Sequence, residues 1–203
     1  MNSPAEHAPD GSSTPADARP AEAHDGALAQ QAQNGDRRAL DLLVERHHPA
    51  VTRLLWRFVR RRADLEDLVQ DTFLRMVRGL GDWREDQPFS HWLLRIATNV
   101  GRDYFRRQSV RQRHAADGAN SDTPPEAPDS APDPAARAAA NEAKELLAHL
   151  SPDERALLTL YHLEGWSLRQ IADQYGWTLT ATKLRAWRAR RRLHSLLKTK
   201  DLQ

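Results

Sequence analysis

Apolar residues in this 203-residue chain recur at steps of three and four, in two separate blocks, and this periodicity constrains the fold most. The pattern is clearest between residues 64 and 80, where the positions that share one helix face are Leu65, Leu68, Val69, Phe73, Met76, Val77 and Leu80. Such spacing is typical of an amphipathic helix. No segment shows the apolar–polar alternation of a strand, and the sequence contains no internal repeat. The sequence therefore predicts an all-α fold.

Composition divides the chain into four parts. Residues 1–26 are rich in Pro, Ala, Ser and Asp and are predicted to form a disordered tail. A first helical block covers residues 27–113. Residues 114–140 are acidic and Pro-rich, which is typical of a flexible linker. A second helical block covers residues 141–203, so we expect two small helical domains joined by that linker.

Local signals predict where helices begin and end in the first block. Residues 34–36, Asn-Gly-Asp, indicate a turn followed by an N-cap. Pro49 is expected to interrupt or restart the helix that follows. Asp64 and Ser90 are the expected N-caps of two further helices, separated by the polar loop at residues 81–88.

The second block contains the pattern of a helix-turn-helix. Ser151 and Ser167 each begin a capping box, and Gly176 marks a turn after the second of these helices. A new helix is expected from about Thr178, with the cations Lys183, Arg185, Arg188, Arg190, Arg191 and Arg192. A helix of this kind fits the major groove of DNA, with early residues on base edges and later cations on phosphates.

Charge is distributed unevenly along the chain, although the formal net charge is only +2. Residues 41–113 carry 15 basic and 10 acidic side chains, and residues 151–203 carry 10 and 5. Residues 114–150, which lie between them, carry 2 and 7. Two basic helical blocks suit a polyanion that is bound at two places, while solvated helix faces are the alternative explanation.

Several classes of function are disfavoured by composition. The chain has no cysteine, which excludes disulfides, thiolate metal sites and a cysteine nucleophile. Its nine histidines lack ligand spacing, so no metal and no cofactor is expected. The first 20 residues lack the pattern of a signal peptide, and no apolar run is long enough for a membrane span. We therefore expect a cytoplasmic protein that does not insert into membranes.

Two clusters allow both a structural and a functional interpretation. The polar face of the 64–80 helix is either a solvated surface with acids near the positive helix end or a docking surface for a protein. Aromatics next to arginines suit stacking on single-stranded bases, although helical aromatics usually belong to the core. Trp92 and Phe105 are therefore expected to be at least partly buried, and the loop residues Trp83 and Phe89 are the stronger candidates for base stacking.

Three motifs, in this order, carry a family resemblance: DLEDLVQDTFLRMVR, FSHWLLRIATNVGRDYFRR and LSPDERALLTLYHLEGWSLRQIADQYG. With them the chain resembles the bacterial extracytoplasmic-function (ECF) sigma factors of the sigma-70 family. The resemblance implies an N-terminal sigma helical bundle for core polymerase binding and −10 recognition, and a C-terminal helix-turn-helix domain for −35 recognition. It implies an alternative sigma factor that binds core RNA polymerase, reads −35 duplex, and melts and captures −10 DNA, and that is not an enzyme.

The resemblance also assigns residues to three surfaces. Residues implied to bind the β′ clamp helices of core RNA polymerase are Asp64, Glu66, Asp67, Gln70, Asp71, Phe73, Leu74 and Arg75. Residues implied to contact −10 DNA are Trp83, Arg84, Phe89, Trp92, Arg95, Asn99, Asp103, Arg106 and Arg107. Residues implied to contact −35 DNA are Thr180, Thr182, Lys183, Leu184, Arg185, Trp187, Arg188 and Arg191. Further implied partners are the β flap, promoter DNA and an anti-sigma factor, which in this family is often membrane-bound.

One segment departs from the family pattern. Where the family usually has Gly-Thr-Val-Lys-Ser-Arg-Leu, residues 180–186 read Thr-Ala-Thr-Lys-Leu-Arg-Ala. Thr182 and Ala186 stand at usually apolar positions, and Leu184 and Trp187 add bulk. We expect a recognition helix that is rotated slightly or that packs partly through Trp187, so the −35 base preference of the family does not carry over.

Two other functions would explain part of this sequence. An operator-binding regulator would explain the helix-turn-helix but not the polar 64–80 face or the loop aromatics. A recombinase would need a nucleophile on an α/β catalytic domain, and the sequence has no strand pattern to build one. Promoter-dependent transcription with purified core polymerase separates these hypotheses.

Overall fold

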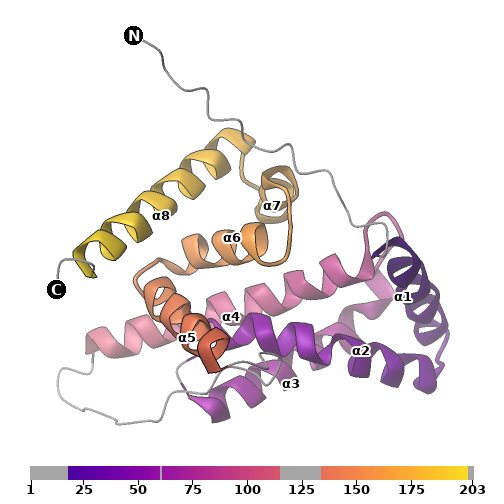
Figure 1. The fold of residues 1–203 in the computed structure, drawn as a ribbon. Helices are drawn as coiled ribbons and strands as arrows, with labels where there is room; N and C mark the ends of the chain where they lie inside the picture. The colour runs from indigo at the N-terminus through magenta and orange to yellow at the C-terminus, as the bar shows by residue number, and fades with distance from the viewer. Residues whose placement is uncertain (1–17, 60, 115–133, 201–203) are drawn as a thin grey trace.

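The structure is a computed structural model that describes residues 18–59, 61–114 and 134–200 (Figure 1). Its elements are α1 (Ala18–Gln33), α2 (Arg37–Trp56), α3 (Arg62–Gly79), the 3₁₀ turn η1 (Leu80–Asp82), α4 (Phe89–His114), α5 (Pro134–Ala148), α6 (Pro152–His162), α7 (Leu168–Tyr175) and α8 (Leu179–Lys200). All regular elements in these three ranges are helical, which confirms the predicted fold class. In the same ranges, no helix combines the length and the apolar character needed to cross a membrane.

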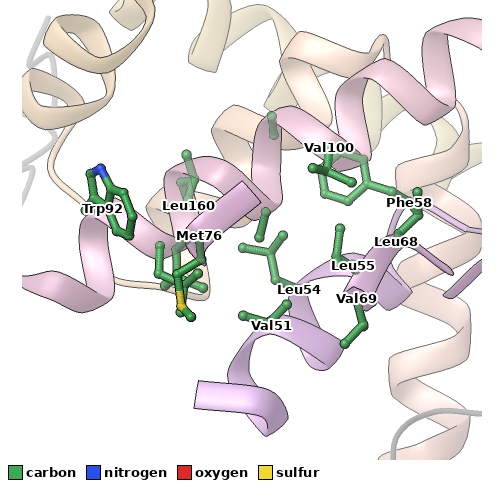
Figure 2. Packing of buried hydrophobic residues seen from close by; sticks show 14 of the residues in the cluster. Val51, Leu54, Leu55, Phe58, Leu68, Val69, Met76, Trp92, Val100 and Leu160 are labelled. Carbon is green, nitrogen blue, oxygen red and sulfur yellow. The ribbon is translucent and has the colours of Figure 1, made fainter. Parts of the chain in front are cut away.

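Helices α1 to α4 form the N-terminal bundle around an apolar core (Figure 2). Val51, Leu54 and Leu55 of α2 are fully buried, and they belong to the same core cluster as Met76 of α3 and Val100 of α4. Met76 is one of the residues that the periodicity of residues 64–80 placed on the apolar face of its helix. The crossing of α4 with the end of α2 depends on Gly101, because a Cβ there would lie 2.8 Å from the Phe58 ring.

The predicted disordered tail is wrong for residues 18–26, since α1 begins at Ala18; residues 1–17 lie outside the described part of the chain. The physical reason is an ion-pair cluster that anchors α1 to α2. Asp25 is buried and its carboxylate lies 2.7 Å from Arg46 Nη1 and 3.0 Å from His47 Nε2. The amino-acid composition of residues 18–26 does not reveal this contact between α1 and α2.

Three helix boundaries also differ from the sequence prediction. Pro49 lies inside a continuous α2, because its ring removes only one N–H donor and the apolar face of the helix stays packed. Helix α3 begins at Arg62, so Asp64 lies in its first turn and is not the N-cap. Helix α4 begins at Phe89, which places Ser90 inside the helix. In contrast, Asp36 caps α2 as predicted, accepting from the backbone N–H groups of residues 38 and 39.

The C-terminal helices follow the local signals closely. Ser151 and Ser167 both form complete capping boxes at the starts of α6 and α7. Gly176 ends α7 in the left-handed conformation, with φ of 62°. Helix α5 begins at Pro134, so the last residues of the predicted linker, 134–140, are helical; residues 115–133 lie outside the described part.

The two halves of the chain are in contact in this structure, with α6 lying against α4 (Figure 1). Arg155 of α6 is buried at this junction, where its Nη1 donates to the Arg57 carbonyl at 3.0 Å and its Nε donates to the Leu147 carbonyl at 2.9 Å. Its guanidinium lies 3.9 Å from the centre of the Phe105 ring. The two helical halves are therefore packed against each other in this conformation.

Candidate nucleic-acid interface

Helix α8 presents a mixed cationic and apolar face to solvent. Thr182, Ala186 and Ala189 are buried and hold the helix against the rest of the C-terminal half. The side chains left exposed on the outer face are Thr180, Lys183, Leu184, Trp187, Arg188 and Arg191. These belong to the residues that the sequence placed on −35 DNA.

Two residues of the segment that departs from the family pattern, Thr182 and Ala186, lie on the buried face of α8. The Thr182 hydroxyl donates to the Thr178 carbonyl at 3.1 Å and is buried, so it faces the domain interior and does not reach DNA. Ala186 is buried in the same way, and Trp187 is 53% exposed. Small side chains on the inner face allow α8 to approach closely, and Trp187 stays outside. Packing of α8 onto the domain therefore runs through Thr182 and Ala186 and not mainly through Trp187.

Several arginines of α8 are already held by neighbouring rings. Arg185 is half-buried, with its guanidinium 4.3 Å from the centre of the Trp177 ring. Arg191 lies 5.3 Å from the Trp187 ring centre, and Arg192 Nη1 is 3.0 Å from Glu154. Cation–π contacts of this kind position a guanidinium without neutralising it. The charges of Arg185 and Arg191 therefore remain available to phosphates at defined places along the helix, whereas Arg192 is paired with Glu154.

The residues that the sequence placed on −10 DNA divide into two groups. Arg84, Asp103, Arg106 and Arg107 are exposed, and Arg95 and Asn99 are half-buried on α4. The aromatics Trp83, Phe89 and Trp92 are at most 4% exposed and belong to the N-terminal core. The prediction that the loop aromatics stack on bases is wrong for this conformation, because the loop folds inward and Trp83 packs edge-on against Phe89.

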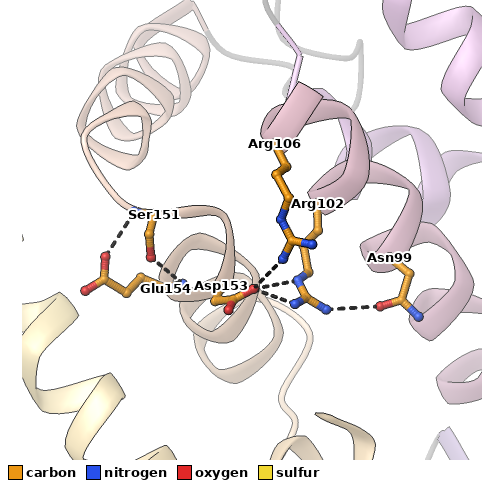
Figure 3. Close-up of polar contacts among 6 residues, drawn as sticks. All are labelled: Asn99, Arg102, Arg106, Ser151, Asp153 and Glu154. Atoms are coloured by element: carbon orange, nitrogen blue, oxygen red, sulfur yellow. Dashed lines mark hydrogen bonds and ion pairs between the residues drawn. The ribbon is translucent and has the colours of Figure 1, made fainter. Parts of the chain in front are cut away.

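A polar junction between the two halves covers part of the −10 candidate surface (Figure 3). Arg102 Nε of α4 donates to Asp153 Oδ1 of α6 at 2.8 Å, and Arg106 Nη2 lies 3.9 Å from the same oxygen. Arg102 also donates to Asn99 Oδ1 at 3.4 Å. The Asp153 carboxylate therefore lies where a DNA phosphate would meet these two arginines. Arg102, Asp153 and Arg155 were not among the predicted site residues, because local spacing does not show which side chains meet across the chain.

Helix α3 presents the third candidate surface. Glu66, Asp67, Gln70, Leu74 and Arg75 are exposed and Asp71 is half-buried, with Arg75 Nη2 2.9 Å from its carboxylate. Exposed apolar side chains continue this surface, since Leu74 is 47% and Val77 is 46% exposed. Apolar groups left in water on a charged helix face favour docking over the alternative of a simply solvated surface.

Asp64 and Phe73, predicted for the same surface, are buried instead. Arg61 Nη2 donates to the Asp64 carboxylate at 2.8 Å, and the Tyr104 hydroxyl of α4 donates to it at 2.7 Å. Burial and the adjacent Asp64 raise the pKa of Tyr104 to about 12, so the phenol stays a donor. Asp64 therefore joins α3 to α4. Within the described ranges, no group of three or more His, Asp or Glu side chains is gathered as a metal site requires.

Comparison with known proteins finds two family matches along this chain. Residues 43–111 match the family described as Sigma-70 region 2, and residues 140–193 match Sigma-70, region 4. The RNA polymerase sigma factor CarQ of Myxococcus xanthus is 34% identical over 174 residues, covering 84% of this chain and 96% of the relative. The ECF RNA polymerase sigma-E factor of Haemophilus influenzae is 30% identical over 173 residues, covering 82% and 91%.

Solved structures resemble the whole arrangement. CnrH, solved in complex with the cytosolic domain of CnrY, is similar with a TM-score of 0.64 and 30% identity, over 87% of this chain and 98% of that one. The sigma factor RpoE of Bartonella quintana, solved with the anti-sigma factor NepR, has the same fold, with a TM-score of 0.60 and 24% identity over 78% and 96%.

Proposed function

This chain belongs to the ECF RNA polymerase sigma factors of the sigma-70 family, and from this premise we propose which of its surfaces bind polymerase, promoter DNA and a regulator. It is an alternative sigma factor that directs promoter-specific transcription initiation. Binding energy drives promoter melting in this proposal, because a base held in a protein pocket gains stacking that offsets lost pairing. The proposal therefore requires no catalytic residue.

The exposed face of α3 is the proposed docking surface for the β′ clamp helices. Asp67, Gln70 and Asp71 supply polar contacts, and Leu74 supplies an exposed apolar anchor. Apolar anchors inside a polar rim are typical of protein interfaces. Asp64 and Phe73 support this surface from within the bundle.

The exposed residues of α4, together with Arg84, are the proposed −10 surface. Asp103, Arg106 and Arg107 of α4 are exposed, and Arg95 and Asn99 lie half-buried in the first half of the same helix. Arginine guanidinium planes can both stack on unpaired bases and neutralise phosphates. The buried aromatics Trp83, Phe89 and Trp92 would support this surface, and they would contact bases only if the loop opened.

The exposed face of α8 is the proposed −35 reader. It lies at the second helix of a helix-turn-helix, whose early residues reach base edges in the major groove. The boundaries at residues 27–113 and 141–203 are proposed for the polymerase and −10 domain and for the −35 domain. Because CnrH was solved with the cytosolic domain of CnrY and RpoE with the anti-sigma factor NepR, we also propose an anti-sigma partner for this chain. We propose that it acts in the cytoplasm with the polymerase.

Run-off transcription with purified core polymerase tests the proposal. The chain added to core is expected to start transcription at discrete promoters of its own genome. Asp67→Arg is expected to weaken co-purification with core, because it reverses charge on the proposed docking face. The matched control Asp173→Arg reverses an exposed charge on α7 and is expected to bind core normally. Promoter binding without core, together with no initiation, would favour the operator-binding regulator.

A further inference from the structure

Two large apolar side chains stand in water on the proposed DNA-reading face of α8. Leu184 is 44% exposed and Trp187 is 53% exposed, and their separation of three residues places them on the same face. Neither is needed for packing, since the inner face of α8 is filled by Thr182, Ala186 and Ala189. An exposed apolar pair at the start of a recognition helix needs a binding partner to explain it.

The charge of α8 indicates which partner this is. Residues 179–200 contain eight Lys or Arg residues and no acidic residue. Lys183, Arg188 and Arg191 are exposed on the same face and surround the apolar pair. A helix with this charge is suited to the polyanionic groove of DNA, where the cations would meet phosphates and the pair between them would meet base edges.

The chemistry of the two side chains then limits which bases they can read. Leucine has no hydrogen-bonding group and the tryptophan indole has a single N–H donor, so neither can make the bidentate hydrogen bonds that identify guanine or adenine. The apolar group on a base edge in the major groove is the 5-methyl group of thymine. The Arg185 guanidinium, which could read guanine, is instead held 4.3 Å from the Trp177 ring centre. We infer that Leu184 and Trp187 select thymine in the −35 element through its 5-methyl group.

This inference rests on the proposed −35 role of α8, and replacing thymine by deoxyuridine tests it, because only the methyl group is removed. The full chain with core polymerase would first select its −35 element from promoter duplexes randomised over that element. Thymine is expected at two positions. Replacing each thymine by deoxyuridine is expected to weaken holoenzyme binding about fourfold, the value for one buried methyl-sized group.

The variants Leu184→Ala and Trp187→Ala identify which side chain contacts each thymine 5-methyl group. Each variant is expected to bind the thymine duplex more weakly and to lose its response to deoxyuridine at one position. Leu197→Ala, which truncates an exposed leucine roughly three turns beyond Trp187 on α8, is the matched control and is expected to keep the full response.

Equal wild-type binding to thymine and deoxyuridine duplexes would overturn the inference, as would an unchanged deoxyuridine response in both variants. The comparison of wild-type binding to thymine and deoxyuridine duplexes tests the inference even if a variant fails to fold. Either of the two overturning results is compatible with promoter-dependent initiation, so neither would contradict the proposed function. Absence of initiation from any promoter would instead contradict the proposed function, and the inference with it.

Discussion

Two cationic side chains, Arg155 and Lys144, lie where the two halves of the molecule meet. Arg155 is almost fully buried, yet its guanidinium donates to two backbone carbonyls and lies on the Phe105 ring. Lys144 of α5 lies 4.3 Å from the Trp56 ring centre, and its buried amine has no hydrogen-bond partner in the structure. A buried charge stabilises a fold only when it is compensated, so these two residues are expected to act in opposite directions.

Arg155→Met is expected to destabilise the chain by about 2–4 kcal/mol, because the Leu147 and Arg57 carbonyls lose their donor while the side-chain volume is kept. Thermal unfolding followed by circular dichroism would measure the change. Arg169→Met, at an exposed position of α7, is the control and should change stability by less than about 0.5 kcal/mol. Equal effects of the two substitutions would contradict the bridging role of Arg155.

Lys144→Met is expected to stabilise the chain at neutral pH by about 1–2 kcal/mol, because it removes a poorly hydrated amine and keeps an apolar stem on Trp56. Burial, and then the adjacent Arg155, lower the pKa of Lys144 from 10.5 to about 8. The unfolded chain therefore binds this proton more tightly than the folded chain does. Wild-type stability should rise as pH increases from 8 to 10.5, through this residue.

The same pH range tests the assignment to Lys144. Urea denaturation at pH 8, 9 and 10 should show a smaller increase in stability for Lys144→Met than for the wild type. Lys198→Met, at an exposed position of α8, should keep the wild-type pH dependence. Parallel pH profiles for all three proteins would show that other groups cause the change.

At the scale of elements, the order and start of most helices follow from local chemistry. Both capping boxes and the left-handed Gly176 formed where the spacing predicted them. The exceptions have tertiary causes: α1 extends to Ala18 because Asp25 binds α2, and α2 continues through Pro49 because its buried face is already packed. The close approach of α4 to the end of α2 is also tertiary, since nothing local distinguishes Gly101 from other glycines.

Gly101→Ala is expected to destabilise the N-terminal bundle by about 1–2 kcal/mol. The new Cβ would lie 2.8 Å from Phe58, and the resulting strain outweighs the roughly 1 kcal/mol of helix propensity that alanine adds. Urea denaturation would measure the loss. Gly81→Ala is the control, because a Cβ at that position would face open space, with no neighbouring group within 4 Å. Stabilisation of the chain by Gly101→Ala would show that α2 and α4 can separate without loss.

At the scale of the whole molecule, the structure shows a closed arrangement. Asp153 of α6 binds Arg102 and lies near Arg106, so the C-terminal half occupies part of the proposed −10 surface. The same junction includes the contact of the His91 ring with the Trp166 ring, 4.7 Å between centroids. The contact between the two halves is therefore expected to compete with −10 DNA for Arg102 and Arg106.

Asp153→Asn is expected to favour the open arrangement by about 1 kcal/mol, since it removes the charge of a partly exposed ion pair. The absence of native cysteine allows specific labelling through Arg78→Cys and His194→Cys, both at exposed positions. Energy transfer between the two labels should fall, and affinity for single-stranded −10 DNA should rise roughly fivefold. Asp173→Asn is the control, and equal energy transfer in the two variants would contradict a closing role for Asp153.

Periodicity and capping residues by themselves determined that this chain is helical and where most of its helices lie, and three sequence motifs determined which family it resembles. These are local properties, since a helix face and a cap are set by residues three or four positions apart. The tertiary structure alone decided that Trp83 and Phe89 are buried, that Thr182 faces inward, and that Asp153 meets Arg102. Burial and ion pairing depend on which distant surfaces pack together, and no spacing along a single chain segment encodes that choice.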